Sequence, residues 1–203
     1  EGLRVFGPRK NAAIIEGSQA FSKDLMKKYK IPTASYETFS DPEAAIAYLE
    51  TAEAPIVIKA DGLALGKGVI IAQDLKEAKD AIHSIMEDKI FGASGNEIVV
   101  EEFLTGPEVS VLAFTDSKIV VPMISSMDHK RALDGDKGLN TGGMGTIAPN
   151  PCYTAAHAKE TMEQIFLPTI RAMVSEGCPF KGCLYFGLMI TPNGIKVIEY
   201  NCR

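Results

Sequence analysis

Lys59-Ala-Asp-Gly-Leu-Ala-Leu-Gly-Lys-Gly68 joins two apolar runs, Pro55-Ile-Val-Ile-Lys59 and Gly68-Val-Ile-Ile-Ala72. The β-branched residues of both runs predict a pair of strands, so the glycines fall in the loop of a hairpin. Glycines let backbone N–H groups approach phosphate oxygens closely, and Lys59 and Lys67 at the two edges would offset phosphate charge. We therefore expect a phosphate-binding hairpin, although a mobile surface hairpin with solvated lysines would have the same pattern.

The glycine-rich loop does not match a P-loop. A P-loop needs four residues between its glycines and a serine or threonine after the lysine. Here three residues separate Gly62 from Gly66, and Gly68 follows Lys67. The next predicted element is also a strand, and not the helix whose N-terminus would bind phosphate.

Composition restricts the class of protein. The chain has 203 residues, 46% of them hydrophobic and 23% charged, as in ordinary globular proteins. A formal net charge of −5 argues against nucleic acid as a partner. We find no apolar run near the ~20 residues of a membrane span. The four cysteines form no CxxC pair and have no histidine at zinc-ligand spacing, so we expect reduced thiols in a cytoplasmic protein.

Helical and strand patterns alternate along the chain and predict an α+β fold. Helices are expected over 11–30, 41–51, 74–88 and 154–176, and strands over 3–6, 33–39, 55–59, 68–72, 97–103, 109–114 and 118–123, with a final hairpin around Asn193-Gly194. We expect a small lobe, approximately 54–116, inserted in a larger lobe formed by 1–53 and 117–203. The glycine-rich segment 125–151 has no periodic signal, and a loop of that length is usually functional.

An acidic pair ends one predicted strand, in Glu101-Glu102-Phe103-Leu104. A carboxylate at that position could accept a hydrogen bond from a purine amino group, and the apolar residues could line its ring. An edge strand with two solvated carboxylates would give the same pattern.

The last predicted strand has a polar face. Side chains alternate along a strand, so Glu199, Asn201 and Arg203 share one face. The opposite face carries Ile198, Tyr200 and Cys202. Carboxylate and amide oxygens two residues apart suit a Mg²⁺ ion that bridges phosphates, and an arginine there could bind a carboxylate or phosphoryl group. A strand face exposed to water would show the same alternation.

The unperiodic segment contains two further motifs, Asp128-His129-Lys130-Arg131 and Asn140-Thr141-Gly142-Gly143-Met144-Gly145. A positive cluster followed by a glycine turn rich in backbone donors could bind a second anionic substrate, or be a solvated charged loop.

Together these segments resemble the ATP-grasp ligases, and within them the glycinamide ribonucleotide synthetase (phosphoribosylamine–glycine ligase) family. The resemblance extends from Phe6-Gly-Pro8 to Asn201-Cys-Arg203. It is densest in Ile56–Ala64, Gly66–Val69 and the two motifs of the unperiodic segment, which other ATP-grasp enzymes do not share. It implies the ATP-grasp fold, in which two α+β lobes clamp the nucleotide.

The resemblance also implies roles for individual residues. ATP would be bound by Lys59, Gly66, Lys67, Gly68, Glu101, Glu102, Phe103, Leu104 and Glu108, with Glu108 at the ribose. Glycine and 5-phosphoribosylamine would be bound by Asp128, His129, Lys130, Arg131, Asn140, Thr141, Gly142, Gly143 and Arg203. Glu199 and Asn201 would bind Mg²⁺ or Mn²⁺, and Arg203 and Lys67 would act in catalysis.

The implied reaction joins glycine to 5-phosphoribosylamine at the expense of ATP, through a glycyl phosphate, in purine biosynthesis. Two alternatives remain: another ATP-grasp carboxylate–amine ligase, and a non-catalytic ATP-binding module. The residues that depart from the family pattern are Gln19, Met127, Leu139 and Phe186. The chain starts on a strand-like run and stops directly after a strand, so we expect a central fragment of a longer protein, inactive alone, without its N-terminal and C-terminal domains. The oligomeric state is not indicated.

Overall fold

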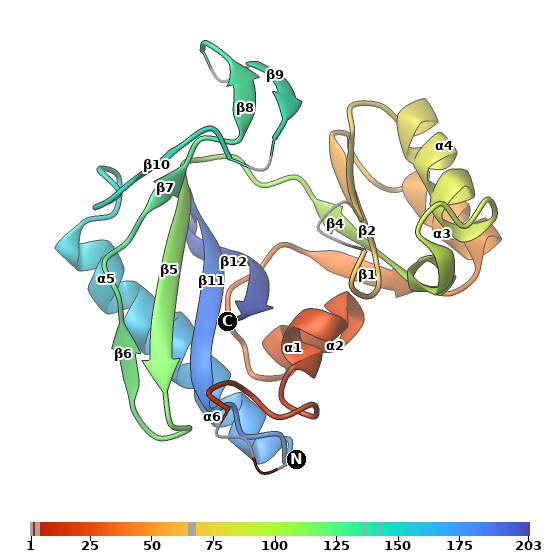
Figure 1. Ribbon diagram of the computed structural model, residues 1–203. Coiled ribbons are helices and arrows are strands. Elements are labelled where there is room, and N and C mark those ends of the chain that lie inside the picture. Colours follow the sequence, from red (N-terminus) through yellow and green to blue (C-terminus); the bar gives the residue numbers. More distant parts are fainter. Residues whose placement is uncertain (1, 3–4, 65–67, 136, 142) are drawn as a thin grey trace. The chain divides into compact units, whose positions relative to one another are not determined.

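The computed structural model describes residues 2, 5–64, 68–135, 137–141 and 143–203 (Figure 1). The chain divides into two compact units. We call Ala13–Leu104 the central unit, and Glu1–Ala12 together with Thr105–Arg203 the terminal unit. Each contains an antiparallel sheet and helices, as the α+β prediction requires.

The central unit consists of one four-stranded sheet and its helices. Its strands are β1 (Tyr36–Phe39), β2 (Ile56–Ala60), β3 (Val69–Ala72) and β4 (Ile98–Glu102), in the order β1-β4-β2-β3. Its helical segments are α1 (Ile14–Gly17), α2 (Gln19–Lys28), α3 (Pro42–Leu49), α4 (Leu75–Met86) and the 3-10 turn η1 (Gly92–Asn96). The predicted hairpin of 55–72 is present as β2 paired with β3.

The two faces of this sheet have different roles. Ile56 and Ile58 of β2 are buried with the apolar side chains of α3 and α4 in one core. The alternate residues Val57 and Lys59 point to the opposite face. Val57 lies opposite Glu101 in the β2–β4 register, so Lys59 and Glu101 share that face. Period-2 alternation thus separates a hydrophobic core from two charged side chains.

Two helices begin at aspartate caps, at the starts expected for the helices 41–51 and 74–88. The Asp41 carboxylate accepts the Glu43 N–H, with Pro42 in the first turn of α3, and the Asp74 carboxylate accepts the Glu77 N–H at α4. The single helix expected over 11–30 is wrong. It is interrupted at Ser18, whose φ of −139° is extended and whose hydroxyl caps α2 by accepting the Phe21 N–H.

The terminal unit contains a second four-stranded sheet, in the order β12-β11-β5-β6. Its strands are β5 (Glu108–Thr115), β6 (Val120–Pro122), β11 (Gly182–Thr191) and β12 (Gly194–Cys202). A continuous helical segment comprises α5 (Ala155–Thr161), the π-helical turn η2 (Met162–Phe166) and α6 (Leu167–Ser175). It confirms the helix predicted over 154–176, capped by the Thr154 hydroxyl.

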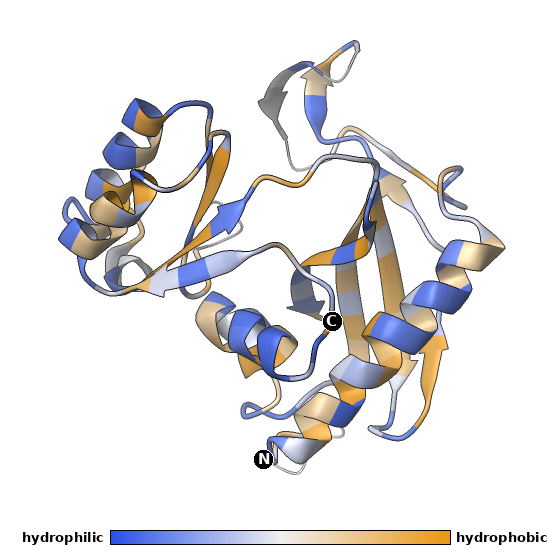
Figure 2. Cartoon of the chain, turned by 180° about the vertical axis from the view of Figure 1, so that it is seen from behind, coloured by the Kyte–Doolittle hydropathy of each residue, from blue (hydrophilic) through white to orange (hydrophobic). Residues whose placement is uncertain are grey.

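The helical segment covers the apolar face of this sheet. The Phe186 ring lies 4.3 Å from that of Phe166 and 5.5 Å from that of Tyr200, measured between centroids. The Tyr200 hydroxyl is 2.9 Å from the Thr169 hydroxyl, so its polar atom is satisfied inside the core. Figure 2 shows hydrophobic and hydrophilic residues alternating around the helical segment, as expected when one side packs on a sheet. Phe186, a departure from the family pattern, is therefore a core residue.

The β11–β12 hairpin is confirmed, and it contains one irregularity. Gly187 pairs with Glu199, but Leu188 pairs with Val197, so Ile198 is an extra residue in β12. Such a bulge inverts side-chain alternation. Val197 before it is buried in the core, and Tyr200 after it is buried on the same side. The bulge consequently turns Glu199 away from the core.

The segment without periodicity contains four short strands in two ribbons. These are β7 (Met127–Asp128) with β10 (Thr146–Ile147), and β8 (Arg131–Leu133) with β9 (Lys137–Asn140). Met127 pairs with Ile147. At the other end of the chain, residues 5–6 are not in a strand, contrary to prediction, and residues 3–4 lie outside the described part.

The two compact units differ from the lobes expected from the sequence. Residues 13–53 belong with the central sheet, because β1 pairs with β4. Residues 105–116 belong with the terminal unit, because β5 pairs with β11 along its whole length. The lobes with boundaries near 54 and 116 stay a prediction; sequence periodicity could not reveal which distant strands pair.

Candidate functional site

Three charged side chains meet on the second face of the central sheet. The Lys23 Nζ of α2 lies 2.9 Å from Glu101 Oε2, and the Lys59 Nζ of β2 lies 2.9 Å from Glu101 Oε1. All three side chains are at most 5% exposed. We call Lys23, Lys59 and Glu101 the charge cluster. Buried charges require such partners, because transfer from water is otherwise prohibitive.

Lys23 is held on several sides. Its ammonium donates to the Thr33 hydroxyl at 2.8 Å and lies 5.6 Å from the centroid of the Tyr36 ring. Burial lowers the pKa of Lys23 to about 8; the attraction of Glu101 opposes this shift, and the repulsion of Lys59 adds to it.

The predicted purine-binding residues lie at and beyond the end of β4. Glu101 is in the charge cluster, where its Oε1 is in contact with the Lys59 ammonium. The Glu102 carboxylate accepts a hydrogen bond from Ser35 at 2.9 Å, Phe103 is exposed, and Leu104 is half-buried.

Part of the predicted phosphate hairpin lies outside the described residues, namely Gly66 and Lys67. At its far end, Gly68 is described: its carbonyl accepts the Ala60 N–H at 2.8 Å. A Cβ on Gly68 would lie 2.6 Å from the Ala64 Cβ, so the close approach of these two chain segments requires glycine.

In the terminal unit, several predicted residues surround one open hollow of about 510 Å³. We call it the polar hollow. Its predicted members are Asp128, Lys130, Gly143, Glu199, Asn201 and Arg203. Among the predicted substrate residues that the structure describes, His129, Arg131 and Thr141 do not line it.

The bulge in β12 and a glycine in β11 place the acidic side of the hollow. Glu199 Oε1 accepts a hydrogen bond from the Asn201 amide at 3.2 Å, so these side chains share a face as predicted. Gly187 lies opposite Glu199, and a Cβ there would be 2.9 Å from the Glu199 Cγ and 3.2 Å from the Tyr185 Cε1. A side chain at position 187 would therefore displace Glu199.

The basic side of the hollow comes from two residues on different elements. Lys130 Nζ donates to Glu108 Oε2 at 2.7 Å. Burial by itself would lower the pKa of Lys130, but the hydrogen bond and charge of Glu108, with help from Tyr185 and Glu199, raise it overall. The Arg203 guanidinium lies 5.5 Å from the Tyr185 ring centroid, a cation–π distance.

Backbone contacts shape the loop beside the hollow. The Met144 N–H donates to the His129 carbonyl and the Thr141 N–H to the Lys130 carbonyl, both at 2.7 Å. Gly143 has a φ of +116°, and a Cβ there would lie 2.9 Å from Asp128 Oδ1. Arg131 instead donates to the Gly138 carbonyl within the β8–β9 ribbon. Gly142 and the side chains of Leu139 and Asn140 lie outside the described part.

Sequence reasoning missed three side chains at these places. Lys23 is buried between apolar positions of α2. A lysine on an otherwise apolar helix face is the sequence pattern that could have identified it. Tyr185 and Ser110 line the polar hollow, with their hydroxyls 3.0 Å apart. Burial raises the pKa of Tyr185, which keeps its hydroxyl protonated. Only the strand register reveals that both face Glu199.

The donors in the hollow suit a hard divalent cation. Glu199 and Asn201 supply a carboxylate and an amide within 3.2 Å of each other, and such oxygen ligands together with phosphate oxygens are typical of Mg²⁺. Among the described residues, no group of three or more His, Cys, Asp or Glu side chains could hold a metal ion by itself. The residues therefore fit a metal that shares its coordination with a bound phosphate.

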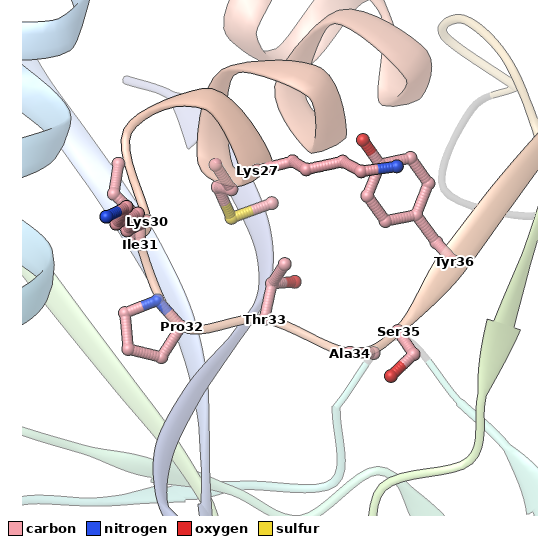
Figure 3. A pocket seen from close by; sticks show the side chains of 9 residues that line it. Lys27, Lys30, Ile31, Pro32, Thr33, Ala34, Ser35 and Tyr36 are labelled. Atoms are coloured by element: carbon pink, nitrogen blue, oxygen red, sulfur yellow. The ribbon is translucent and has the colours of Figure 1, made fainter.

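A separate pocket of about 400 Å³ lies beside the C-terminal end of α2 (Figure 3). It is lined by Lys27, Lys30 and Tyr36 among others, and the Lys27 ammonium lies 5.3 Å from the Tyr36 ring centroid. None of the predicted site residues lines it. Over the described ranges, no helix is sufficiently long and apolar to cross a membrane.

Comparisons with known proteins agree with one another. The family model "Phosphoribosylglycinamide synthetase, ATP-grasp (A) domain" matches residues 17–203. The phosphoribosylamine–glycine ligase of Escherichia coli (strain K12) is 52% identical over 203 residues, which are 100% of this chain and 47% of the relative. That of Fusobacterium nucleatum is 49% identical over 201 residues, with 99% of this chain and 47% of the relative covered.

Among solved structures, phosphoribosylamine–glycine ligase from Thermotoga maritima superposes with a TM-score of 0.91 at 37% identity, covering 98% of this chain and 50% of that one. The chain spans about half the length of the curated relatives it matches. The fold is thus the α+β ATP-grasp fold, and the chain belongs to the phosphoribosylglycinamide synthetase family, whose ATP-grasp domain it contains.

Proposed function

We propose that the full-length protein ligates glycine to 5-phosphoribosylamine with ATP, giving glycinamide ribonucleotide, ADP and phosphate. One observation carries the proposal beyond family membership: Lys130, Arg203 and the Glu199–Asn201 pair surround one polar hollow. Such a hollow offers cationic groups for anionic substrates and oxygen ligands for a metal on phosphate.

The nucleotide would be held mainly by the central unit. Lys59 and, beyond the described residues, Gly66 and Lys67 would contact the phosphates together with Gly68. The chain from Glu101 to Leu104 would bind adenine, and Glu108 the ribose. Because Lys130 now occupies Glu108, binding of a ribose hydroxyl there would replace an existing ion pair.

Substrates would be held by the loop and by Arg203. The Asp128–Arg131 segment and the Asn140–Gly143 segment would contact glycine and the phosphorylated sugar. Arg203 would grip a carboxylate or the transferring phosphoryl group, and its position depends on the Tyr185 ring and on its own N–H, which donates to the Cys183 carbonyl at 2.9 Å.

The chemistry needs no nucleophile from the protein. The glycine carboxylate attacks the γ-phosphorus of ATP, ADP leaves, and the sugar amine then displaces phosphate from the glycyl phosphate. Lys59, Lys67 and Arg203 would stabilise negative charge on the transferring group, and catalysis would come from positioning and electrostatics. A divalent metal, Mg²⁺ or Mn²⁺, held by Glu199 and Asn201 would neutralise phosphate charge. All four cysteines are free thiols, which fits a reaction in the cytoplasm.

The direct test is ADP release by the full-length protein. We expect release that depends on both glycine and 5-phosphoribosylamine. Release with a different carboxylate and amine would assign another carboxylate–amine ligase, and ATP binding without any turnover would leave a non-catalytic ATP-binding module.

A binding measurement tests the metal ligands separately. Glu199→Gln should weaken Mg-ATP binding by at least ~1 kcal/mol, the usual worth of a contact to a charged group. Glu163→Gln, an exposed change on the helical segment, is the matched control and should bind normally. Equal affinity in both variants would refute the assignment of Glu199.

A further inference from the structure

Lys23 is a buried titratable group that the proposed reaction does not use. It is 1% exposed and comes from α2, whereas Lys59 and Glu101 come from neighbouring strands of the sheet. A lysine is rarely buried to this extent unless its charge is needed or fully paired. The buried charge of Lys23 therefore points to a role beyond the reaction itself.

The geometry makes Glu101 a bridge between two ammonium groups. Its two carboxylate oxygens each lie 2.9 Å from one lysine nitrogen, Oε2 from Lys23 and Oε1 from Lys59. Lys23 therefore fixes the orientation of the carboxylate, and the carboxylate limits where the Lys59 ammonium can lie.

The cluster holds two ammonium groups and one carboxylate, and the charge of the Glu102 carboxylate also acts on Lys23. The other groups around Lys23 are Glu102, which is exposed and accepts a hydrogen bond from Ser35, and the uncharged Tyr36 ring. On its own helix, the neighbouring Asp24 carboxylate accepts the Tyr36 hydroxyl at 2.7 Å. Each buried ammonium charge favours an anion nearby.

We propose that Lys23 is a positioning residue for nucleotide binding: through Glu101 it holds the Lys59 ammonium in place, and its charge makes the cluster attractive to a phosphate group. The proposal rests on the proposed binding of ATP, and it assigns Glu101 a positioning role in addition to any contact with the base.

The proposal has a specific pH signature. Because the pKa of Lys23 is lowered to about 8, the group loses its proton as pH rises through that value. The cluster then loses one positive charge, and its attraction for phosphate falls. Nucleotide affinity should therefore be highest below pH 8 and decline above it. The decline should be absent from a variant whose residue 23 is always charged, and also from one whose residue 23 is never charged.

Calorimetric titration of the full-length protein with Mg-ATP between pH 7 and pH 9.5 tests this signature. The wild-type protein should lose about tenfold in affinity, as for one charge removed about 12 Å from a phosphate charge at an effective dielectric constant of about 20. Lys23→Arg should keep its affinity across the range, because an arginine stays charged. Lys23→Met should bind about tenfold more weakly at pH 7 and show no decline attributable to this site.

Two controls separate binding from folding. Lys28→Met removes an exposed lysine from the same helix and should retain the wild-type profile. Thermal unfolding of each variant shows whether Lys23→Met is folded. If Lys23→Met is not folded, the pH profile of Lys23→Arg alone tests the proposal. A decline above pH 8 that persists unchanged in Lys23→Arg would overturn the proposal.

A ligand-free measurement distinguishes this inference from the proposed function. NMR of the lysine ε-methylene groups should show the Lys59 signal shifting with a midpoint near pH 8 in the wild type and not in Lys23→Arg. If the Lys59 signal has the same pH dependence in the wild type and in Lys23→Arg, the two lysines are not coupled, even if ATP binds. If no Mg-ATP binds at any pH while the coupling is present, the proposed function and the phosphate role fail, and the positioning of Lys59 stands.

Discussion

The charge cluster of the central unit and the polar hollow of the terminal unit hold similar ion pairs in opposite surroundings. In the cluster, Lys23, Lys59 and Glu101 are at most 5% exposed. In the hollow, the Lys130 and Glu108 side chains are 40% and 48% exposed. The residue types are the same, and the distances differ by only a few tenths of an ångström.

Burial decides what each pair can do. A buried ion pair cannot exchange its partner for water, so removal of one member leaves an uncompensated charge. An exposed pair is worth little, and water or a ligand can replace either partner at small cost. The cluster is thus suited to hold side chains in fixed positions. The hollow is suited to exchange an ion-pair partner for a bound substrate.

The comparison predicts the largest effect at Glu101. Glu101→Gln leaves two buried ammonium groups facing each other, which should cost about 3–5 kcal/mol in the free energy of unfolding. Glu102→Gln, the exposed neighbour bonded to Ser35, should cost less than about 1 kcal/mol. Chemical denaturation measures both. A loss below about 1 kcal/mol for Glu101→Gln would mean that the cluster is not stabilised by its charges.

A smaller effect is expected at the wall of the hollow. In Gly187→Ala the new methyl group meets the Glu199 Cγ at 2.9 Å. Overpacking of this kind usually costs about 1–3 kcal/mol, and the displaced Glu199 should also weaken Mg-ATP binding. Gly17→Ala is the matched control, because its Cβ would meet nothing within 4 Å and Gly17 is not among the residues that line the hollow. Equal denaturation midpoints and equal binding in the two variants would show that Gly187 does not constrain Glu199.

The smallest effect on stability is expected for the exposed pair. Lys130→Met should lower the free energy of unfolding by less than about 1 kcal/mol, and high salt should abolish the difference. Substrate binding, if the hollow is the site, should suffer more than stability does. If Lys130→Met lost as much stability as Glu101→Gln, the proposed distinction between the two regions would be wrong.

Sequence patterns predicted what depends on neighbours in the chain. The helices expected from 41 and 74 do begin there, with Asp41 and Asp74 as their caps, and alternation along β12 placed Glu199 beside Asn201. The hairpin of β2 and β3 was also evident, because short apolar runs flank its glycines.

Features that depend on distant pairing were not predictable. Lys23 meets Glu101 only because α2 packs on the sheet near β4, and Tyr185 faces Ser110 only through the register of β11 with β5. The strands of 125–151 are two to four residues long, too short to produce a periodic signal. The lobe boundaries depended on the partners of β1 and β5, which the local pattern does not specify.

The bulge absorbs one extra residue, Ile198, in β12. Odd-numbered residues of this strand pack inward before Ile198, and even-numbered ones after it. Deletion of Ile198 would remove the bulge and restore regular alternation, with Glu199 still opposite Gly187 and Tyr200 still opposite Phe186. Glu199 would therefore stay outside the core and Tyr200 inside it, and an engineered graft of Glu199–Arg203 onto a regular strand can omit Ile198.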